Sequence, residues 1–280
     1  METFSPTEVL GALKGHGSIP LVPRRPAVAP ARVGEGVPAF WVTTSASRPD
    51  LTLLFFHGGG FTSGSTTGHI DLCARLADAA RASVFSVDYR LAPEHPFPAA
   101  VDDCLAAYRY LLRRGHPPAG IVPVGISAGG TLVLSLLLAA RDAGLAMPAA
   151  AVCLSPAVDM LFMGESVLFN QETDWLTPEY LTGILDGYLV DHDPSDPLAS
   201  PLYADLQGLP PLLVQAGDGE ILIDGIEAFV STAELQGVSV TFDCVEGMFH
   251  CWQIFAAVLP EGAAAIDRVG VFVRRQVPEE

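Results

Sequence analysis

One serine in this sequence lies in a run of residues that is typical of a catalytic nucleophile. Ser127 is at the centre of Gly125-Ile-Ser-Ala-Gly-Gly130, which matches the pattern Gly-x-Ser-x-Gly. The run follows a predicted strand over Ile121–Val124 and leads into a predicted apolar helix over 128–143. Glycines two positions before and after the serine permit a turn so sharp that larger side chains would collide with neighbouring backbone. The alternative is a solvated serine in a glycine-rich turn, but the flanking strand and helix favour a nucleophile.

A serine nucleophile needs a general base, and the positions of the seven histidines narrow the choice. In a strand–turn–helix arrangement of this kind, the acid and then the histidine follow the serine along the chain. Only His192 and His250 follow Ser127. His192 lies in an Asp-rich loop, as a solvated surface residue would, whereas His250 lies in a turn between a predicted strand and the last helix. We therefore expect His250 to be the base.

The acid that orients this histidine is expected after the predicted strand over Leu212–Ala216. Asp218, Glu220 and Asp224 all lie there. A carboxylate at this point would orient the imidazole and stabilise its charged form. Chemistry alone does not separate the three, and those not used could cap the helix that follows.

A glycine triplet could supply the backbone donors that bind an oxyanion. The residues His57-Gly-Gly-Gly60 follow a predicted strand over Leu51–Phe56, 70 residues before the serine. Glycine lets the backbone N–H groups point freely toward a developing negative charge. We expect His57 itself to be structural, since this pattern uses backbone groups.

The elements around these residues predict an α/β fold. Apolar strands alternate with helices of 10 to 16 residues, which indicates βαβ units and a parallel sheet covered on both faces. The rhythm stops between Ser155 and Leu209, where one helix is expected over Pro178–Leu189; we expect an insertion over the carboxyl ends of the strands. The first fifty residues hold seven prolines. There we expect a short helix over Pro6–Leu13 with Ser5 as N-cap, then an irregular wrap and one strand over Ala39–Thr44.

Composition excludes several classes of function. The chain has 280 residues, 50% of them hydrophobic, and 15 basic against 32 acidic side chains, for a net charge of −17. No basic cluster exceeds a pair, so we expect neither nucleic-acid nor anionic-membrane binding. The five cysteines form no CxxC pair, which indicates mostly buried thiols in a reducing compartment. No signal peptide or membrane span is evident, so a cytoplasmic protein is expected.

Four motifs together resemble the hormone-sensitive-lipase family of α/β-hydrolases, most of all its bacterial members, the family IV carboxylesterases. They are HGGG at 57–60, DYRLAPEHPFPA at 88–99, GISAGG at 125–130 and EGMFHCW at 246–252. The resemblance implies an α/β-hydrolase fold, with a mostly parallel central sheet flanked by helices and a small helical cap. It further implies a single domain over 1–280, with the cap built from about 1–40 and 156–205 and the core from about 41–155 and 206–280.

The resemblance also implies roles for individual residues. Ser127 would be the nucleophile and His250 the base, with an oxyanion hole made by the backbone N–H groups of Gly59, Gly60 and Ala128. Relatives often show D-P-L-x-D with the first Asp catalytic, and the matching residues here are Glu220-Ile-Leu-Ile-Asp224. The match selects Glu220 as the acid, with Asp218 as second choice.

Two departures from the family pattern lie beside these residues. Ile126 replaces the usual Asp or Thr before the nucleophile, and Phe249 replaces the usual Pro before the histidine. We expect the first to remove a polar contact beneath the turn and the second to alter the turn that holds His250. Asp88 and Arg90 are expected to be scaffold, as a buried ion pair or a hydrogen-bonded corner.

The expected function is that of a serine carboxylesterase, which hydrolyses small to medium acyl esters through an acyl-enzyme. A lactonase, amidase, thioesterase or acyltransferase could use the same residues, and a non-catalytic ligand-binding homologue is a further alternative. The presence of His250 argues against that last alternative. No cofactor and no metal are expected, and the expected partner is a small-molecule ester. A homodimer is a further expectation, since relatives are often dimers.

Overall fold

Strands and helices alternate along most of the chain. The computed structural model describes residues 3–16, 24, 26–34 and 36–278. The strands within these residues are β1 (Ala27–Val33), β2 (Val37–Thr43), β3 (Arg48–Phe56), β4 (Ala82–Val87), β5 (Ile121–Ile126), β6 (Ala151–Leu154), β7 (Leu212–Gly217) and β8 (Val240–Val245). The α-helices within them are α1 (Pro6–Leu13), α2 (Ile70–Ala80), α3 (Ala99–Arg113), α4 (Ala128–Asp142), α5 (Ser166–Phe169), α6 (Pro178–Tyr188), α7 (Ile223–Leu235) and α8 (Pro260–Gln276).

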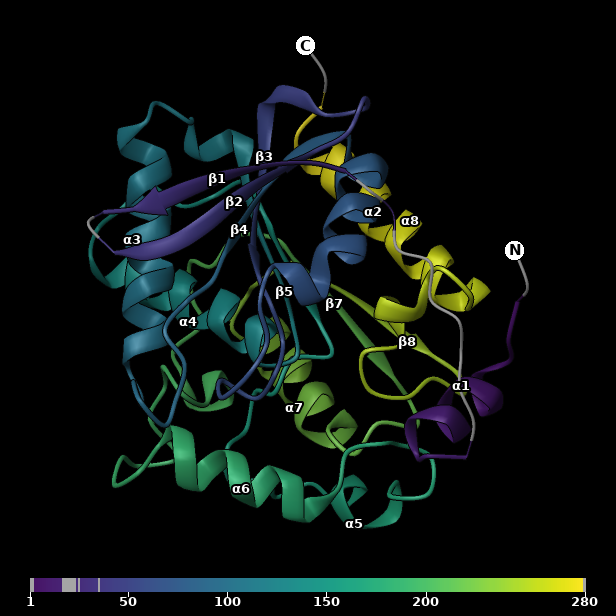
Figure 1. Cartoon of the computed structure of the whole chain (residues 1–280). Helices are drawn as coiled ribbons and strands as arrows, with labels where there is room; N and C mark the ends of the chain where they lie inside the picture. The colour runs from purple at the N-terminus through teal and green to yellow at the C-terminus, as the bar shows by residue number, and fades with distance from the viewer. Residues whose placement is uncertain (1–2, 17–23, 25, 35, 279–280) are drawn as a thin grey trace.

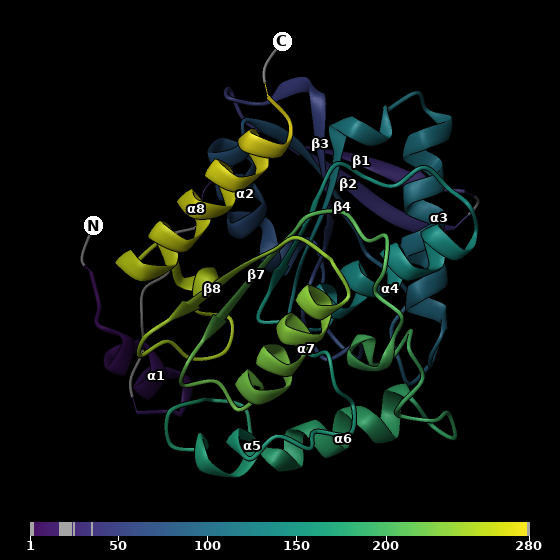
Figure 2. The same ribbon diagram turned by 180° about the vertical axis from the view of Figure 1, so that it is seen from behind.

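These strands form one sheet in the order β1-β2-β4-β3-β5-β6-β7-β8, with helices on both faces (Figures 1 and 2). β2 runs antiparallel to both of its neighbours, and β3 to β8 are parallel. The predicted α/β class and mostly parallel sheet are therefore confirmed. Because the strands are parallel, their carboxyl ends lie at one edge of the sheet, where ligands of such folds bind.

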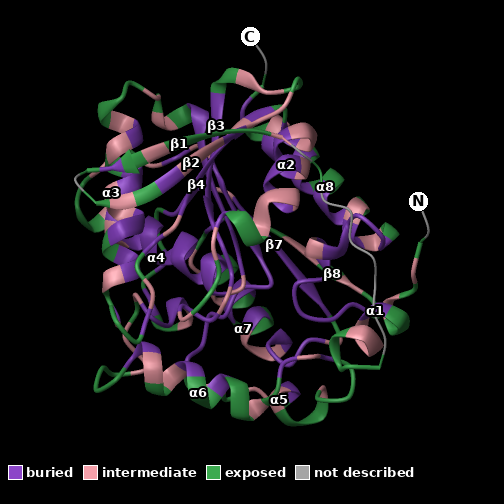
Figure 3. Ribbon diagram, viewed as in Figure 1, coloured by how far each residue is buried: buried purple, intermediate pink, exposed green. Residues whose placement is uncertain are grey.

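The period of two in β3 explains why helices cover both faces. Alternate side chains of a strand point to opposite sides of its sheet. Leu53 and Phe55 pack with α2 and α8, whereas Leu54 and Phe56 pack with α3, α4 and α7. All four side chains are fully buried. In Figure 3 the central strands are accordingly coloured as buried along most of their length.

The prediction of an irregular N-terminal wrap was wrong over β1. This strand pairs with β2 at the edge of the sheet, so residues 27–33 and 37–40, which we expected in the cap, join the sheet instead. Most of β1 is exposed, so no alternation of buried side chains marks it, and Pro30 is tolerated because an edge strand need not donate on its outer side. The remainder of the expected wrap, over 17–23, lies outside the described residues.

Helix α1 is confirmed with its N-cap. The Ser5 hydroxyl accepts from the Glu8 N–H, and the Glu8 carboxylate accepts from the Ser5 N–H at 2.8 Å, which is a capping box. Val9 on this helix packs on Met248, Phe249 and the segment that follows them.

Two other boundaries differ from the sequence pattern, which predicts a helix over Ala228–Gln236 and a closing helix from Ala256 onward. Helix α7 begins at Ile223, five residues earlier than expected, and α8 begins only at Pro260, after a short 3₁₀ turn over Trp252–Phe255. Pro260 is favourable in a first helical turn, which explains the later start of α8.

The insertion between β6 and β7 carries α5 and α6, which lie together beyond the carboxyl ends of the strands, at the bottom of Figure 1. The helix predicted over 178–189 is confirmed as α6. The Thr177 side chain caps it by accepting from the Tyr180 N–H. None of the described helices is long and apolar enough to cross a membrane.

The scaffold expectation for Asp88 and Arg90 is only partly right. Asp88 makes a hydrogen-bonded corner, since it accepts from the Thr66 N–H and hydroxyl at 2.6 and 2.7 Å. Arg90 is exposed and pairs with buried Asp103 at 2.8 Å, so the two residues do not form a buried ion pair with each other. All five cysteines are free, and four are buried; Cys244 is exposed.

Candidate active site

Ser127 lies in a sharp turn between β5 and α4. Its backbone has φ 55° and ψ −124°, a conformation that is strained for a non-glycine residue. A Cβ on Gly125 would lie 2.0 Å from the Gly129 carbonyl oxygen, and one on Gly129 would lie 2.0 Å from that of Phe56. Backbone carbonyl groups therefore leave no room for a side chain at either position, which accounts for the Gly-x-Ser-x-Gly pattern.

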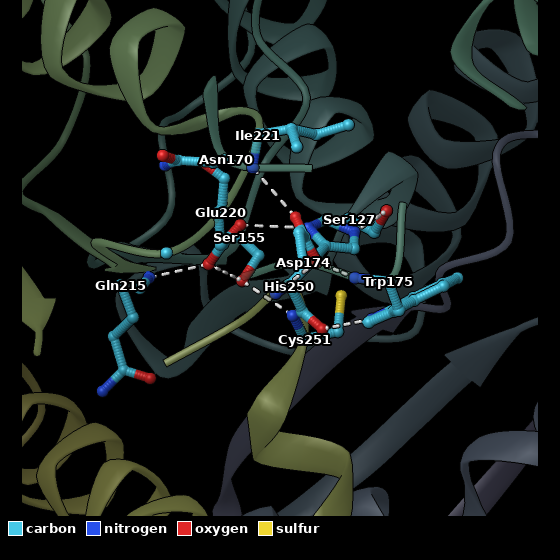
Figure 4. Close-up of polar contacts among 12 residues, drawn as sticks. Ser127, Ser155, Asn170, Asp174, Trp175, Gln215, Glu220, Ile221, His250 and Cys251 are labelled. Carbon is cyan, nitrogen blue, oxygen red and sulfur yellow. Dashed lines mark hydrogen bonds and ion pairs between the residues drawn. The ribbon is translucent and has the colours of Figure 1, made fainter. Parts of the chain in front are cut away.

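The structure brings Ser127, His250 and Glu220 into one chain of hydrogen bonds (Figure 4). Ser127 Oγ lies 2.9 Å from His250 Nε2, and His250 Nδ1 lies 3.0 Å from Glu220 Oε2. His250 and Glu220 are 1% and 0% exposed. Since a carboxylate only accepts, Nδ1 donates to Glu220, which leaves Nε2 free to accept the serine proton.

The competing candidates lie elsewhere. His192 is exposed in its loop, with its ring edge-on to Phe97. Asp218 is exposed and accepts from the Gly247 N–H at 2.7 Å. Asp224 lies in the first turn of α7 and accepts from a backbone N–H of the insertion. Among the three acids, the geometry joins Glu220 to the histidine.

Ser155 is a member of the site that the sequence analysis did not identify. Its hydroxyl donates to Glu220 Oε1 at 2.7 Å, and the Gly217 N–H donates to the same oxygen at 2.7 Å. Three donors thus compensate the loss of water around the Glu220 carboxylate. The serine follows β6 with φ 46°. The available signals were its position directly after a predicted strand and its place in Ser155-Pro-Ala-Val-Asp159, a run that the family resemblance also covers.

The surroundings of His250 set its protonation. Burial by itself lowers the pKa of His250, whereas contact with Cys251 and the hydrogen bond and charge of Glu220 raise it, so that the pKa lies well above 6.5. Burial raises the pKa of the Cys251 thiol, which is therefore neutral. We accordingly assign the rise at His250 to the Glu220 carboxylate.

The backbone of the glycine triplet is held in a fixed orientation. His57 Nδ1 donates to the Gly58 carbonyl at 2.9 Å, and the Ser63 N–H donates to the Gly59 carbonyl at 3.0 Å. A trans peptide unit is planar, with its N–H opposite its C=O. These two bonds therefore set the directions of the Gly59 and Gly60 N–H groups. φ values of 122° and 59° at these residues suit glycine.

His57 is a structural residue, whose buried ring helps to hold the glycine triplet in place. Burial lowers the pKa of His57 to about 4, so the ring is neutral at neutral pH. It stacks on Tyr89 with ring centroids 4.2 Å apart, and the Tyr89 hydroxyl donates to the His57 carbonyl at 2.8 Å.

A cavity of about 290 Å³ opens over Ser127. Gly59, Gly60, Ala128 and His250 line it, so the expected oxyanion donors and the serine face the same space. Its other walls include apolar and aromatic side chains of the insertion, namely Met160, Phe162, Trp175, Leu176, Tyr180, Leu181 and Ile184. The described lining residues include no Asp, Glu, Lys or Arg.

The two departures from the family pattern are both accommodated by apolar packing. Ile126 is buried, lines the cavity and packs in the core beneath α2 and α8. Phe249 is buried among Trp252, Phe255 and the residues of α1. Within the described part of the chain, no group of three or more His, Cys, Asp or Glu side chains is arranged to hold a metal ion.

Comparisons with known proteins identify the family and the fold. Residues 53–254 match the family described as alpha/beta hydrolase fold. An acetyl-hydrolase of Streptomyces hygroscopicus is 44% identical over 242 residues, which cover 86% of this chain and 81% of the relative. A crystal structure of an esterase from the bacterial hormone-sensitive lipase family is similar with a TM-score of 0.89 and 43% identity, covering 99% of this chain and 93% of that one.

A crystal structure of EstE5 soaked with p-nitrophenyl butyrate has the same TM-score, 0.89, with 38% identity, and covers 99% of this chain and 92% of that one. Family match, relative and solved structures thus coincide over nearly the whole chain. This chain belongs to the α/β-hydrolase fold family and, within it, to the carboxylic ester hydrolases of the bacterial hormone-sensitive-lipase family.

Proposed function

We propose that this carboxylic ester hydrolase acts through Ser127 as nucleophile, His250 as general base and Glu220 as the acid that orients the imidazole. The observation that carries the proposal is the hydrogen-bonded chain Ser127–His250–Glu220, with distances of 2.9 and 3.0 Å, at the floor of an apolar cavity. A serine hydroxyl is a weak nucleophile until such a base removes its proton.

The reaction follows from these positions. Ser127 Oγ attacks the ester carbonyl carbon while its proton passes to His250 Nε2, which forms a tetrahedral intermediate. That intermediate collapses to the acyl-enzyme as His250 returns the proton to the leaving alcohol. Water, deprotonated by His250, then attacks the acyl-enzyme, and the second tetrahedral intermediate collapses as His250 returns the proton to Ser127 Oγ and the carboxylic acid leaves. The charge that forms on His250 in each step is balanced by the Glu220 carboxylate.

The oxyanion of both intermediates is proposed to bind the N–H groups of Gly59, Gly60 and Ala128. No acceptor within the described residues engages these three N–H groups. The first two have the fixed orientation described above, and the third is at the first position of α4, where the helix dipole favours negative charge. Loss of one such donor costs on the order of 3 kcal/mol of transition-state stabilisation.

We propose uncharged esters with small to medium acyl groups as the substrate class. An apolar lining without charged side chains disfavours a charged acyl group, because nothing there would compensate its desolvation. The cavity volume of about 290 Å³ lies at the lower end of the range for small-molecule sites, about 300–1,000 Å³. The similarity to an acetyl-hydrolase, and to EstE5 soaked with p-nitrophenyl butyrate, points the same way.

A p-nitrophenyl ester series from acetate to palmitate tests this proposal. We expect kcat/KM to be highest for the shortest acyl groups and to fall with chain length, and Ser127→Ala to release p-nitrophenol no faster than buffer. Ile184→Ala, which enlarges the cavity at the wall formed by α6, should shift the substrate preference toward esters with longer acyl chains. Unchanged turnover by Ser127→Ala would refute the role of the serine, and highest activity on palmitate would refute the substrate class.

Amides and lactones tested beside the ester series distinguish the alternatives. Hydrolysis of p-nitroanilides or lactones with a kcat/KM above that of every ester would make an amidase or lactonase the better description. Absence of turnover on all of them, together with saturable ligand binding, would favour a non-catalytic ligand-binding homologue.

Location and assembly are proposals of the same kind. A cytoplasmic location is supported by five free thiols, four of them buried. A net charge of −17 supports the absence of nucleic-acid and anionic-membrane partners. A homodimer is supported by the family resemblance. Cell fractionation, filter binding to DNA, and light scattering coupled to size-exclusion chromatography test these three in turn.

A further inference from the structure

A second buried carboxylate lies beside the candidate triad without taking part in the proton transfer described above. Asp174 is in the segment between α5 and α6 and is 0% exposed. Its contacts are with main-chain N–H groups: Oδ1 accepts from His250 at 3.1 Å and from Trp175 at 2.7 Å, and Oδ2 accepts from Ile221 at 2.9 Å (Figure 4). A buried carboxylate is costly unless its hydrogen bonds are satisfied, and here three donors satisfy it.

The donors on Asp174 belong to the loops that carry the proton-transfer residues. Ile221 directly follows Glu220 on the loop after β7, and His250 is on the loop after β8. One carboxylate, supplied by the insertion, therefore joins the backbone of both loops. It lies close to the first residues of α7, where the helix dipole further favours a negative charge.

Trp175 provides a second hydrogen bond between the insertion and the backbone of His250. Its indole Nε1 donates to the His250 carbonyl oxygen at 2.7 Å, so that both the N–H and the C=O of His250 are bonded to adjacent residues of the insertion. The next amide, that of Cys251, donates to Ser155 Oγ at 3.2 Å, and this hydroxyl in turn donates to Glu220. The backbone around His250 is thus fixed relative to the acid by side chains from two other segments.

We propose that Asp174 and Trp175 are positioning residues, which hold His250 and Glu220 at the distance that proton transfer requires. The insertion then does more than cover the cavity: its seating on the two loops sets the geometry of the candidate triad. This inference rests on the proposed roles of His250 and Glu220. A misplacement of reacting groups by about 1 Å costs on the order of 100-fold in rate, so the effect should appear in kcat. For the Asp174 variants KM should change little, because Asp174 is not among the residues that line the cavity.

The test compares Asp174→Ala, Asp174→Asn and Trp175→Phe with Thr177→Ala. Thr177→Ala removes a hydrogen bond from the same insertion, but the bond it removes is to the Tyr180 N–H of α6 and not to either loop. We expect Asp174→Ala to lower kcat for p-nitrophenyl butyrate by about 100-fold with little change in KM. Asp174→Asn should show a smaller loss, since one oxygen still accepts from His250 and Trp175 while its amide group opposes the Ile221 N–H. Trp175→Phe removes the Nε1 donor from the histidine carbonyl together with part of the ring that lines the cavity, so it should lower kcat and also alter KM. Thr177→Ala should leave kcat unchanged.

A second readout does not depend on turnover. The His250 Nδ1 proton, hydrogen-bonded to Glu220, is expected to give a far-downfield resonance in one-dimensional ¹H NMR. This resonance should be present in wild type and Thr177→Ala and lost in Asp174→Ala, with folding checked by circular dichroism. If Asp174→Ala does not fold, Asp174→Asn and Trp175→Phe decide the question.

Folded Asp174 variants with wild-type kcat and an unchanged resonance would overturn the proposal, as would an equal loss of kcat in Thr177→Ala. Failure of the wild type to hydrolyse any ester would instead overturn the proposed function, and the NMR comparison would still decide the positioning role.

Discussion

Replacement of Glu220 by glutamine tests whether Glu220, and not a neighbouring acid, orients His250. The carboxylate accepts three hydrogen bonds, from His250 Nδ1 at 3.0 Å and from the Ser155 hydroxyl and Gly217 N–H at 2.7 Å each. Glutamine has nearly the same shape but only one accepting oxygen, and its amide nitrogen can only donate. One side of the former carboxylate must therefore face a donor.

The structure indicates which side the amide nitrogen takes. Facing Gly217 and Ser155, it would oppose the Gly217 N–H, which can only donate, at about 1–3 kcal/mol for the unsatisfied group, while the Ser155 hydroxyl would have to turn from donor to acceptor. Facing His250, it donates to Nδ1 once the imidazole adopts its other tautomer, and all groups are satisfied. That tautomer carries its proton on Nε2, which then cannot accept the proton of Ser127. The expected loss in kcat is about 10⁴-fold, equivalent to about 5 kcal/mol of activation free energy.

The assay is release of p-nitrophenol from p-nitrophenyl butyrate, with thermal unfolding as a check on the fold. Asp218→Asn is the matched control, because asparagine keeps the oxygen that accepts from Gly247 at the surface. We expect this control to stay within about twofold of wild type, as most surface substitutions change free energies by no more than ~0.5 kcal/mol. A Glu220→Gln enzyme with near-wild-type kcat, or a collapse of kcat in Asp218→Asn, would refute the assignment.

Two further predictions concern pH and the turn at the nucleophile. Since His250 must be neutral to act as base and its pKa is raised above 6.5, kcat/KM should rise with pH through that pKa and be lost as pH falls; a midpoint at or below 6.5 in the pH profile would contradict this. Gly129→Ala places a Cβ 2.0 Å from the Phe56 carbonyl oxygen, so the enzyme should lose about 3 kcal/mol or more and its Tm should fall by about 6–12 °C. Gly183→Ala, at an open position of α6, is the control and should leave Tm unchanged or slightly raised; equal Tm values for the two variants would contradict the packing argument.

Much of the fold could be predicted because the spacing of apolar residues and the residues that begin and end helices are local features of the sequence. The buried strands β5 and β6 are continuous apolar runs, and β7 is interrupted only by Gln215. Helix α6 begins with a Thr cap followed by Pro. β1 could not be predicted in the same way. It is an exposed edge strand with a proline in it, and its identity depends on pairing with β2 and so on tertiary structure.

The residues of the site likewise differ in whether a local sequence pattern or only the tertiary structure identifies them. Ser127 could be found from the sequence because its turn imposes glycines at fixed spacing, and His250 because few histidines follow it. Glu220 required the family resemblance, since three acids lie within seven residues and only the fold decides which faces the histidine. Asp174 carries no motif, and Ser155 lies in a run that the family resemblance covers, Ser155-Pro-Ala-Val-Asp159, without a role being evident. The roles of both arise from hydrogen bonds to residues 47 to 96 positions away.

Covalent labelling of the nucleophile tests the central claim most directly. Diethyl p-nitrophenyl phosphate reacts with an activated serine and releases p-nitrophenol, and peptide mapping by mass spectrometry locates the phosphoryl group that remains. We predict one diethylphosphoryl group per chain, on Ser127, with loss of esterase activity in proportion to labelling. A label on another residue, or full labelling of Ser127 with activity retained, would contradict the account.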